Sequence, residues 1–276
     1  MLHYKVQWRA RGNYPGHHPS LQRGGGLQFR NHVPLIDAPD PRRFDVRASL
    51  RDPFLQIQVR VYQQPSAIPV YVIADLSASM RFGGAASKAH RVAELVADLS
   101  YSAYRTGDPF GFIGCADSHT APLFLALTAR RAAGLEIAET LRATPPQGKS
   151  SEGLLKAANL LSARRALVFL VSDFHFSTPL LEQLLASLAY HDLVPVILRD
   201  RNEDENVPNF GLARVVDHET GQSRMLLMRP ELKRQIQQKF AVRQKEQSSL
   251  FNQFGRRPLV LHDEFVPDEV TRYFFG

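Results

Sequence analysis

The stretch Pro69-Val70-Tyr71-Val72-Ile73-Ala74-Asp75-Leu76-Ser77-Ala78-Ser79-Met80 decides the fold, because its unbroken apolar run ends abruptly in Asp-x-Ser-x-Ser. A continuous apolar run of this length is typical of a strand buried on both faces of a parallel sheet. Open α/β folds bind their ligands at the carboxyl ends of such strands. Asp75, Ser77 and Ser79 are therefore expected together on one loop at that edge. Their oxygen atoms suit Mg²⁺ better than zinc or copper, which prefer imidazole and thiolate ligands.

This loop resembles the metal-ion-dependent adhesion site of von Willebrand factor A domains, in which the aspartate and both serines of Asp-x-Ser-x-Ser hold a divalent cation. The resemblance implies two more loops: a Thr or Ser before a later helix, and an Asp that ends a later strand. Gly148-Lys149-Ser150-Ser151 supplies the first, and the apolar strand at residues 166–173 ends on Asp173. On this match Ser150 replaces the threonine and Asp173 is the last ligand. Ser151 could serve instead of Ser150, and either could only cap the helix that follows.

A second block narrows the resemblance to the bacterial family known as domain of unknown function fifty-eight. Its usual pattern is Arg-x-Ile-Asp-Trp-x-x-Ser-Ala-Arg, and this chain has Arg42-Arg43-Phe44-Asp45-Val46-Arg47-Ala48-Ser49-Leu50-Arg51. The Arg, Asp, Ser and Arg are kept, while Phe, Val and Leu stand for Ile, Trp and Ala. The similarity runs from about residue 23 to past residue 198. Members are similar to von Willebrand A domains, often accompany MoxR-type AAA+ ATPases, and in many cases carry N-terminal membrane helices that this chain lacks.

The alternation of predicted strands and helices indicates an α/β fold with a doubly wound, mostly parallel sheet of von Willebrand A or Rossmann type. We expect a basic N-terminal extension at residues 1–53, a core with the metal site at 54–200, and a C-terminal addition at 201–276. The glycines and prolines of residues 1–34 predict an irregular arm. Residues 54–62 alternate apolar and polar side chains, which predicts a strand paired beside the central strand. In the C-terminal part we expect a hairpin, a helix at 230–254, a short strand at 258–261 and a helix at 267–275.

Composition limits the class of protein. The chain has 276 residues and a net charge of +7, most of it in residues 1–60, where ten Lys or Arg face four Asp or Glu. No nucleic-acid motif accompanies this basic segment, so we expect no nucleic-acid partner. No apolar run is long enough to span a bilayer and the N-terminus lacks a signal-peptide core, so a cytoplasmic location is expected. The single cysteine, Cys115, lies in an apolar run and is expected in the core.

Three enzymatic or nucleotide-binding interpretations compete with the metal site. A haloacid-dehalogenase-like phosphatase could use Asp75 and Asp173, but that class needs Asp-x-Asp and position 77 is Ser. A serine hydrolase lacks its Gly-x-Ser-x-Gly motif. A phosphate-binding loop ending in Gly148-Lys149-Ser150 lacks its first glycine, which would fall at Ala143.

The favoured hypothesis is a non-catalytic, divalent-metal-dependent module for protein–protein interaction. Mg²⁺, or Mn²⁺ in its place, would keep one coordination position open for a carboxylate of a protein partner. Four residues are expected at the rim that contacts the partner: Met80, Arg81, Lys149 and His175. The family resemblance implies that a MoxR-type ATPase is a partner, in the maturation or assembly of other proteins.

Overall fold

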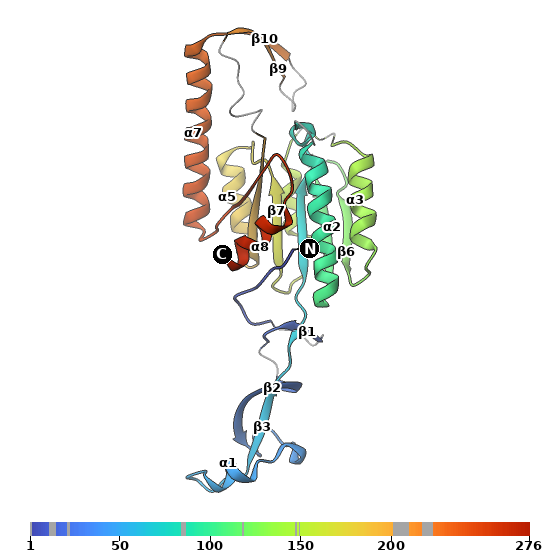
Figure 1. The fold of residues 1–276 in the computed structure, drawn as a ribbon, viewed down its shortest axis with the longest axis vertical. Helices are drawn as coiled ribbons and strands as arrows, with labels where there is room; N and C mark the ends of the chain where they lie inside the picture. Colours follow the sequence, from blue (N-terminus) through green and yellow to red (C-terminus); the bar gives the residue numbers. More distant parts are fainter. Residues whose placement is uncertain are drawn as a thin grey trace. The chain divides into compact units, whose positions relative to one another are not determined.

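The computed structural model describes residues 2–10, 15–20, 23–83, 87–117, 119–146, 148, 150–200, 210–216 and 223–276. It divides into two compact units (Figure 1). The larger unit contains Met1–Lys5, Pro69–Arg105 and Pro109–Gly276, and the smaller contains Val6–Ile68 with Thr106–Asp108. The boundary before the core therefore falls after Ile68, whereas the sequence predicts it after residue 53. In the described part of the chain, no helix is both long and apolar enough to cross a membrane.

The larger unit is built on one six-stranded sheet, in the order β11-β8-β7-β4-β5-β6. All neighbouring strands are parallel except β5 and β6, which form an antiparallel pair. This confirms the predicted α/β fold with a mostly parallel sheet. The strands are β4 (Val70–Asp75), β5 (Phe110–Cys115), β6 (Leu123–Thr128), β7 (Leu167–Ser172), β8 (Asp192–Arg199) and β11 (Leu259–His262).

The strand order places the predicted loops at one point. β4 is the first strand of this sheet in the chain, yet it lies in the middle, between β5 and β7. The chain moves outward from β4 to β6 and then returns to β7 on the other side, so the strand order reverses between β4 and β7. Crevices at such reversals, outside the carboxyl ends of the strands, are where open α/β sheets bind ligands.

Helices cover the sheet because its strands are apolar on both faces. Tyr71 and Ile73 of β4 pack in a core with leucines of α5 and with Phe251 of α7. Val70 and Val72 point to the opposite face, where Figure 1 shows α2 running along the sheet. The helices are α2 (Lys88–Thr106), α3 (Ala133–Ala143), α4 (Gly153–Ala158), α5 (Thr178–Ser187), α7 (Pro230–Gln253) and α8 (Pro267–Phe275), and Ala78–Arg81 form a 3₁₀ turn, η2.

The C-terminal part agrees closely with the sequence prediction. The hairpin of β9 (Gly211–Val216) and β10 (Ser223–Met228) forms a separate two-stranded sheet, and the long helix and the terminal helix follow. Between these two helices in the chain, β11 joins the edge of the main sheet beside β8.

The smaller unit corrects two expectations. Its elements are β1 (Pro15–His18), β2 (Arg23–Pro34), the 3₁₀ turn η1 (Pro41–Arg43), α1 (Val46–Leu50) and β3 (Gln58–Gln63). β3 pairs with β2 and not with the central strand, and β2 is a regular strand within the arm expected to be irregular. The pairing buries Val33 against Val59 and Val61. A shift of register between Arg23 and Gln28 accommodates the glycines that argue against a strand.

A buried carboxylate links distant segments of the smaller unit. Asp108 is almost fully buried and accepts three hydrogen bonds: from the Ile68 N–H (2.9 Å), the His18 ring (2.7 Å) and the Thr106 hydroxyl (2.8 Å). Buried carboxylates are stable only when their oxygens are paired in this way. Asp108 therefore ties segments that are far apart in the sequence.

We predict that Asp108→Ala lowers the free energy of unfolding of the smaller unit by about 3 kcal/mol or more, because several buried donors lose their acceptor. Trp8, the only tryptophan of the chain, belongs to this unit, so urea unfolding followed by tryptophan fluorescence measures the change. Glu182→Ala, at an exposed position of α5 in the larger unit, is the control and should leave the curve unchanged. A loss below about 1 kcal/mol would contradict the assigned role of Asp108.

Candidate functional site

The carboxylate of Asp75 is the centre of the candidate site. It ends β4 and is completely buried. Its Oδ1 accepts the Ser77 backbone N–H at 2.9 Å, and its Oδ2 accepts the hydroxyls of Ser151 at 2.9 Å and Ser172 at 2.8 Å. The hydroxyls of Ser77 and Ser79 lie 3.1 Å apart. Three loops that are distant in the sequence thus meet at one carboxylate.

Backbone pairing holds the first two loops together. The Ala78 N–H donates to the Gly148 carbonyl at 2.7 Å, and the Gly148 N–H donates to the Leu76 carbonyl at 3.4 Å. The approach requires glycine, because a Cβ at position 148 would lie 2.2 Å from the Cβ of Ala116. The second loop is therefore fixed against the first before its serines are placed.

The sequence leaves open whether Ser150 or Ser151 belongs to the site, and the structure places the two serines differently. Ser151 is buried and its hydroxyl donates to Asp75. Ser150 is half-buried, and its backbone N–H donates to the Asp117 carboxylate at 2.7 Å. Ser151, the alternative, is thus the serine of this loop whose hydroxyl reaches Asp75, and Ser150 positions the loop through its backbone.

Asp173 has a partner that sequence analysis did not identify. The Lys88 ammonium lies 2.9 Å from its Oδ2, and the two side chains are 0% and 2% exposed. Lys88 is the first residue of α2, its backbone N–H donates to the Phe82 carbonyl at 2.9 Å, and its ammonium lies 5.8 Å from the centre of the Phe82 ring. A lysine at a helix start gives no signal in the sequence that it will fold inward onto a carboxylate.

The two carboxylates have opposite pKa shifts. Burial, together with the charge of Asp173, raises the pKa of Asp75 to about 6. Burial acts in the same direction on Asp173, but the charges of Lys88 and His175 and the hydrogen bonds from Lys88 and the His175 N–H outweigh it and hold the Asp173 pKa below its ordinary value. Asp173 thus carries its charge together with Lys88, whereas Asp75 relies on hydrogen bonds from neutral groups.

Ser172 extends the network to the loop after β7. Its hydroxyl accepts the Phe174 N–H at 2.9 Å while donating to Asp75. Phe174 has a φ of 55°, which is unusual for a bulky residue, and its side chain is completely buried. Sequence analysis identified Asp173 in this strand and overlooked Ser172, although both end the same strand.

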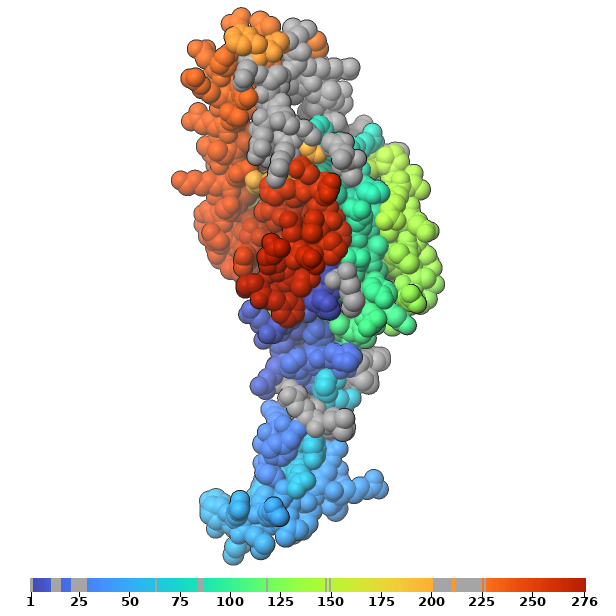
Figure 2. Space-filling view, in the orientation of Figure 1, coloured from blue at the N-terminus to red at the C-terminus, as the bar shows by residue number. Residues whose placement is uncertain are grey.

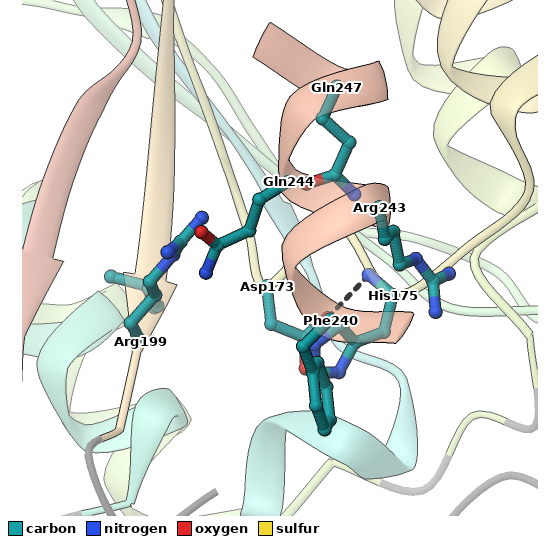
Figure 3. A pocket seen from close by; sticks show the side chains of 8 residues that line it. Asp173, His175, Arg199, Phe240, Arg243, Gln244 and Gln247 are labelled. Atoms are coloured by element: carbon teal, nitrogen blue, oxygen red, sulfur yellow. Dashed lines mark hydrogen bonds and ion pairs between the residues drawn. The ribbon is translucent and has the colours of Figure 1, made fainter. Parts of the chain in front are cut away.

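The helix α7 lies against this loop (Figure 3). Gln247 donates to the Phe174 carbonyl at 2.7 Å, and Arg243 donates to the Phe176 carbonyl at 2.9 Å. A cavity of about 20 Å³, room for one water molecule, lies between the loop, the end of β8 and α7. It is lined by Asp173, His175, Leu198, Arg199, Phe240, Arg243, Gln244 and Gln247.

The four residues expected at the partner-binding rim have different positions. His175 is about one-third exposed (32%), with its ring 3.5 Å from the Asp173 carboxylate. Arg81 is exposed and donates to the Pro146 carbonyl. Met80 is completely buried, which corrects its assignment to the rim, since its apolar side chain packs in the core. Lys149 lies outside the described residues.

The donor set fits a hard divalent ion in part. Carboxylate and hydroxyl oxygens at Asp75, Ser77, Ser79 and Ser151 are ligands of the type that Mg²⁺ accepts. The described residues contain no group of three or more His, Cys, Asp or Glu placed to hold a metal, so serine hydroxyls must contribute. Asp173 already has a cation beside it, and two unit charges 4 Å apart repel by roughly 4 kcal/mol at an effective dielectric constant of about 20. A divalent ion that uses Asp173 must therefore compete with Lys88.

Comparison with known proteins agrees with the resemblance to the family known as domain of unknown function fifty-eight. A family described as "Protein of unknown function DUF58" matches residues 40–249, which include every candidate site residue. An uncharacterized protein in the 3′ region of moxR from Paracoccus denitrificans is 42% identical over 73 residues, 26% of this chain and 70% of that protein.

Solved structures show similarity at low sequence identity. The conserved hypothetical protein BatB from Bacteroides thetaiotaomicron aligns over 76% of this chain and 100% of its own, with 14% identity and a TM-score of 0.43. The VWA domain of SpRpn10 aligns over 49% of this chain and 75% of its own, with 14% identity and a TM-score of 0.36.

We predict that Lys88→Met lowers the free energy of unfolding by about 3–5 kcal/mol, because Asp173 is left as a buried charge without its cation. The double variant Lys88→Met with Asp173→Asn should recover most of this loss, since it removes both charges. A double-mutant cycle from urea unfolding measures the coupling. Lys156→Met, at an exposed lysine of α4, is the control. Additive losses in the cycle would show that the ion pair does not contribute as assigned.

The raised pKa of Asp75 predicts a pH dependence of stability. Between its unfolded value of 3.8 and its folded value of about 6, the folded state binds more protons at this group, so stability falls as pH rises through this window. Asp75→Asn removes that contribution. The stability of the wild type relative to Asp75→Asn should therefore increase as pH is lowered from 7 to about 4.5. Urea unfolding at several pH values measures the difference, and a constant difference would refute the raised pKa.

Proposed function

Because the chain belongs to the family described as protein of unknown function DUF58, we propose that it is a non-catalytic module that binds other proteins through the loops around Asp75. One observation carries the proposal: the loop after β4, the end of β7 and the loop before α4 converge on a single buried carboxylate. This arrangement occurs at the strand-order reversal, where α/β sheets bind ligands. Hydrogen bonds within the chain hold the three loops in place, and the loops offer oxygen atoms to a ligand.

A divalent cation, Mg²⁺ or Mn²⁺, is part of the proposal. Asp75, Ser77, Ser79 and Ser151 would hold it, with Asp173 contributing when Lys88 releases it. A bound cation would supply an acceptor for a carboxylate of the partner protein, since hard divalent ions take oxygen ligands. The residues of this chain orient that site: Ser172 holds Asp75, and Gly148 keeps the serine loop in place.

A non-catalytic role is favoured over the phosphatase alternative by the residue two positions after Asp75. The phosphatase class needs a second carboxylate there as its general acid and base. Position 77 is Ser, which cannot fill that role. This substitution supports a binding site and not a phosphoryl-transfer site.

The proposed partner is a MoxR-type AAA+ ATPase, in the maturation or assembly of other proteins. The support is that a relative of this chain is described by its position in the 3′ region of moxR. A cytoplasmic location, where an ATPase finds its nucleotide, belongs to the same proposal.

The experiment is a calorimetric titration of the EDTA-treated chain with Mg²⁺ and Mn²⁺, followed by binding to a purified MoxR-type ATPase with and without metal. We expect saturable metal binding that Asp75→Asn and Ser79→Ala weaken by at least about tenfold, because each removes a donor oxygen. Glu182→Gln is the matched control away from the site. A phosphatase assay on the same samples tests the alternative.

Two results would contradict the proposal. Binding of the ATPase that is unchanged in Asp75→Asn would exclude these loops as the contact surface. Hydrolysis of a phosphate ester that is lost in Asp75→Asn would show that the site is catalytic.

A further inference from the structure

The helix α1 of the smaller unit has its polar and apolar faces reversed. Val46 and Leu50, one helical turn apart, are 55% and 79% exposed. The side facing the unit carries Ser49, whose hydroxyl donates to the Asp45 carbonyl at 2.7 Å and accepts the Gln58 N–H at 2.8 Å. A surface helix normally turns its apolar side inward, so this orientation indicates that another surface covers α1.

The turn that follows α1 presents two more apolar side chains. The Asp52 carboxylate accepts the backbone N–H groups of Phe54 at 3.1 Å and Gln56 at 2.8 Å and the side-chain amide of Gln58 at 3.1 Å. Phe54 and Leu55 are 79% and 87% exposed. Leu55 has a φ of 55°, a left-handed conformation that is unfavourable for leucine. The carboxylate thus holds a strained backbone that projects apolar side chains into solvent, as functional loops do.

The exposed apolar side chains belong to one surface. The Leu35 N–H donates to the Ile57 carbonyl at 2.7 Å, which brings Ile36, 88% exposed, beside the turn. The Gln58 contacts to Ser49 and Asp52 bring α1 to the same place. We call this surface the apolar knob, and it comprises Ile36, Val46, Leu50, Phe54, Leu55 and Ile57. In Figure 2 it belongs to the blue and light-blue part of the chain.

The exposed charges around the apolar knob are mainly cationic. Asp45 is buried and accepts from Arg60 at 2.7 Å and His32 at 3.1 Å, and Asp52 holds the turn. Asp40 pairs with Arg43 at 3.1 Å, whereas Asp37, next to Ile36, is exposed. The arginines of α1 and its flanks, Arg42, Arg47 and Arg51, are exposed. Arg47 of α1 and Arg51, which caps the end of α1, lie one turn apart, next to Val46 and Leu50. The surface therefore offers apolar groups flanked by cations.

We propose that the apolar knob docks on an anionic lipid bilayer, with Phe54 and Leu55 inserted among the lipids and the arginines at the phosphate groups. Apolar side chains flanked by Arg are the pattern of interfacial membrane binding. A second copy of the chain would place arginines against arginines. The side chains project from a tight turn, and a fluid bilayer accepts such a shape without a matching cavity.

Co-sedimentation of the full chain with phosphatidylglycerol/phosphatidylcholine vesicles tests the proposal. The wild type should pellet with these vesicles and not with pure phosphatidylcholine. Phe54→Ser with Leu55→Ser should weaken partitioning at least about tenfold, because two apolar side chains no longer enter the bilayer. Arg47→Gln with Arg51→Gln should weaken it about fivefold per arginine and reduce its salt dependence.

The controls separate membrane docking from protein binding and from a general change in solubility. Phe210→Ser alters an aromatic side chain of similar exposure, 75%, in the larger unit, and should leave vesicle binding unchanged. Wild-type protein that stays in solution with anionic vesicles would overturn the proposal, as would pelleting of both double variants to the same extent as the wild type. A third result would also show that the lipid assignment is wrong. If the wild type does not bind anionic vesicles, while Phe54→Ser with Leu55→Ser loses binding to the MoxR-type ATPase, the apolar knob is a protein interface.

Discussion

The buried carboxylate of Asp75 is the constraint on which the larger unit depends. Removing an ionised carboxylate from water is unfavourable by several kcal/mol unless hydrogen bonds replace the lost water. Those hydrogen bonds come from Ser77 and Ser151, on two different loops, and from Ser172 at the end of β7. Each loop must therefore reach its final position before the charge at the end of the central strand is stabilised, and the geometry of the site follows from this requirement.

Asp173 meets the same requirement by a different route, with the Lys88 ammonium as its partner. A pair of this kind, with both side chains buried, contributes less to net stability than to position, because desolvation offsets much of the attraction. Its main effect is to join the start of α2 to the end of β7. The two carboxylates thus divide the site into a half held by neutral hydroxyls and a half that contains its own cation, which restricts where an additional cation can be placed.

The sequence predicted the features that depend on periodicity and on strand ends, and it failed where tertiary contacts decide. The apolar runs identified β4 and β7, and hence Asp75 and Asp173, because buried parallel strands have few sequence alternatives. Alternation identified β3 but not its partner, since a half-polar strand can pair with any edge. Ser150 and Ser151 differ by one position in a loop without regular period, and tertiary contacts, including the Gly148 pairing and the Ser150 N–H bond to Asp117, set their direction. Lys88 could not be predicted, because its role arises from the packing of α2.

The two units use carboxylates in the same way, with different results at their surfaces. In the smaller unit Asp45, Asp52 and Asp108 are all bound to backbone or side-chain donors of that unit. Since these three carboxylates are bound internally, most of the exposed charge around the turn comes from arginines, and the turn that Asp52 stabilises carries leucine and phenylalanine outward. In the larger unit the serines that stabilise Asp75 keep the charge inside, at the edge of the sheet. Internal satisfaction of aspartates therefore determines both the oxygen-lined site of one unit and the cationic, apolar surface of the other.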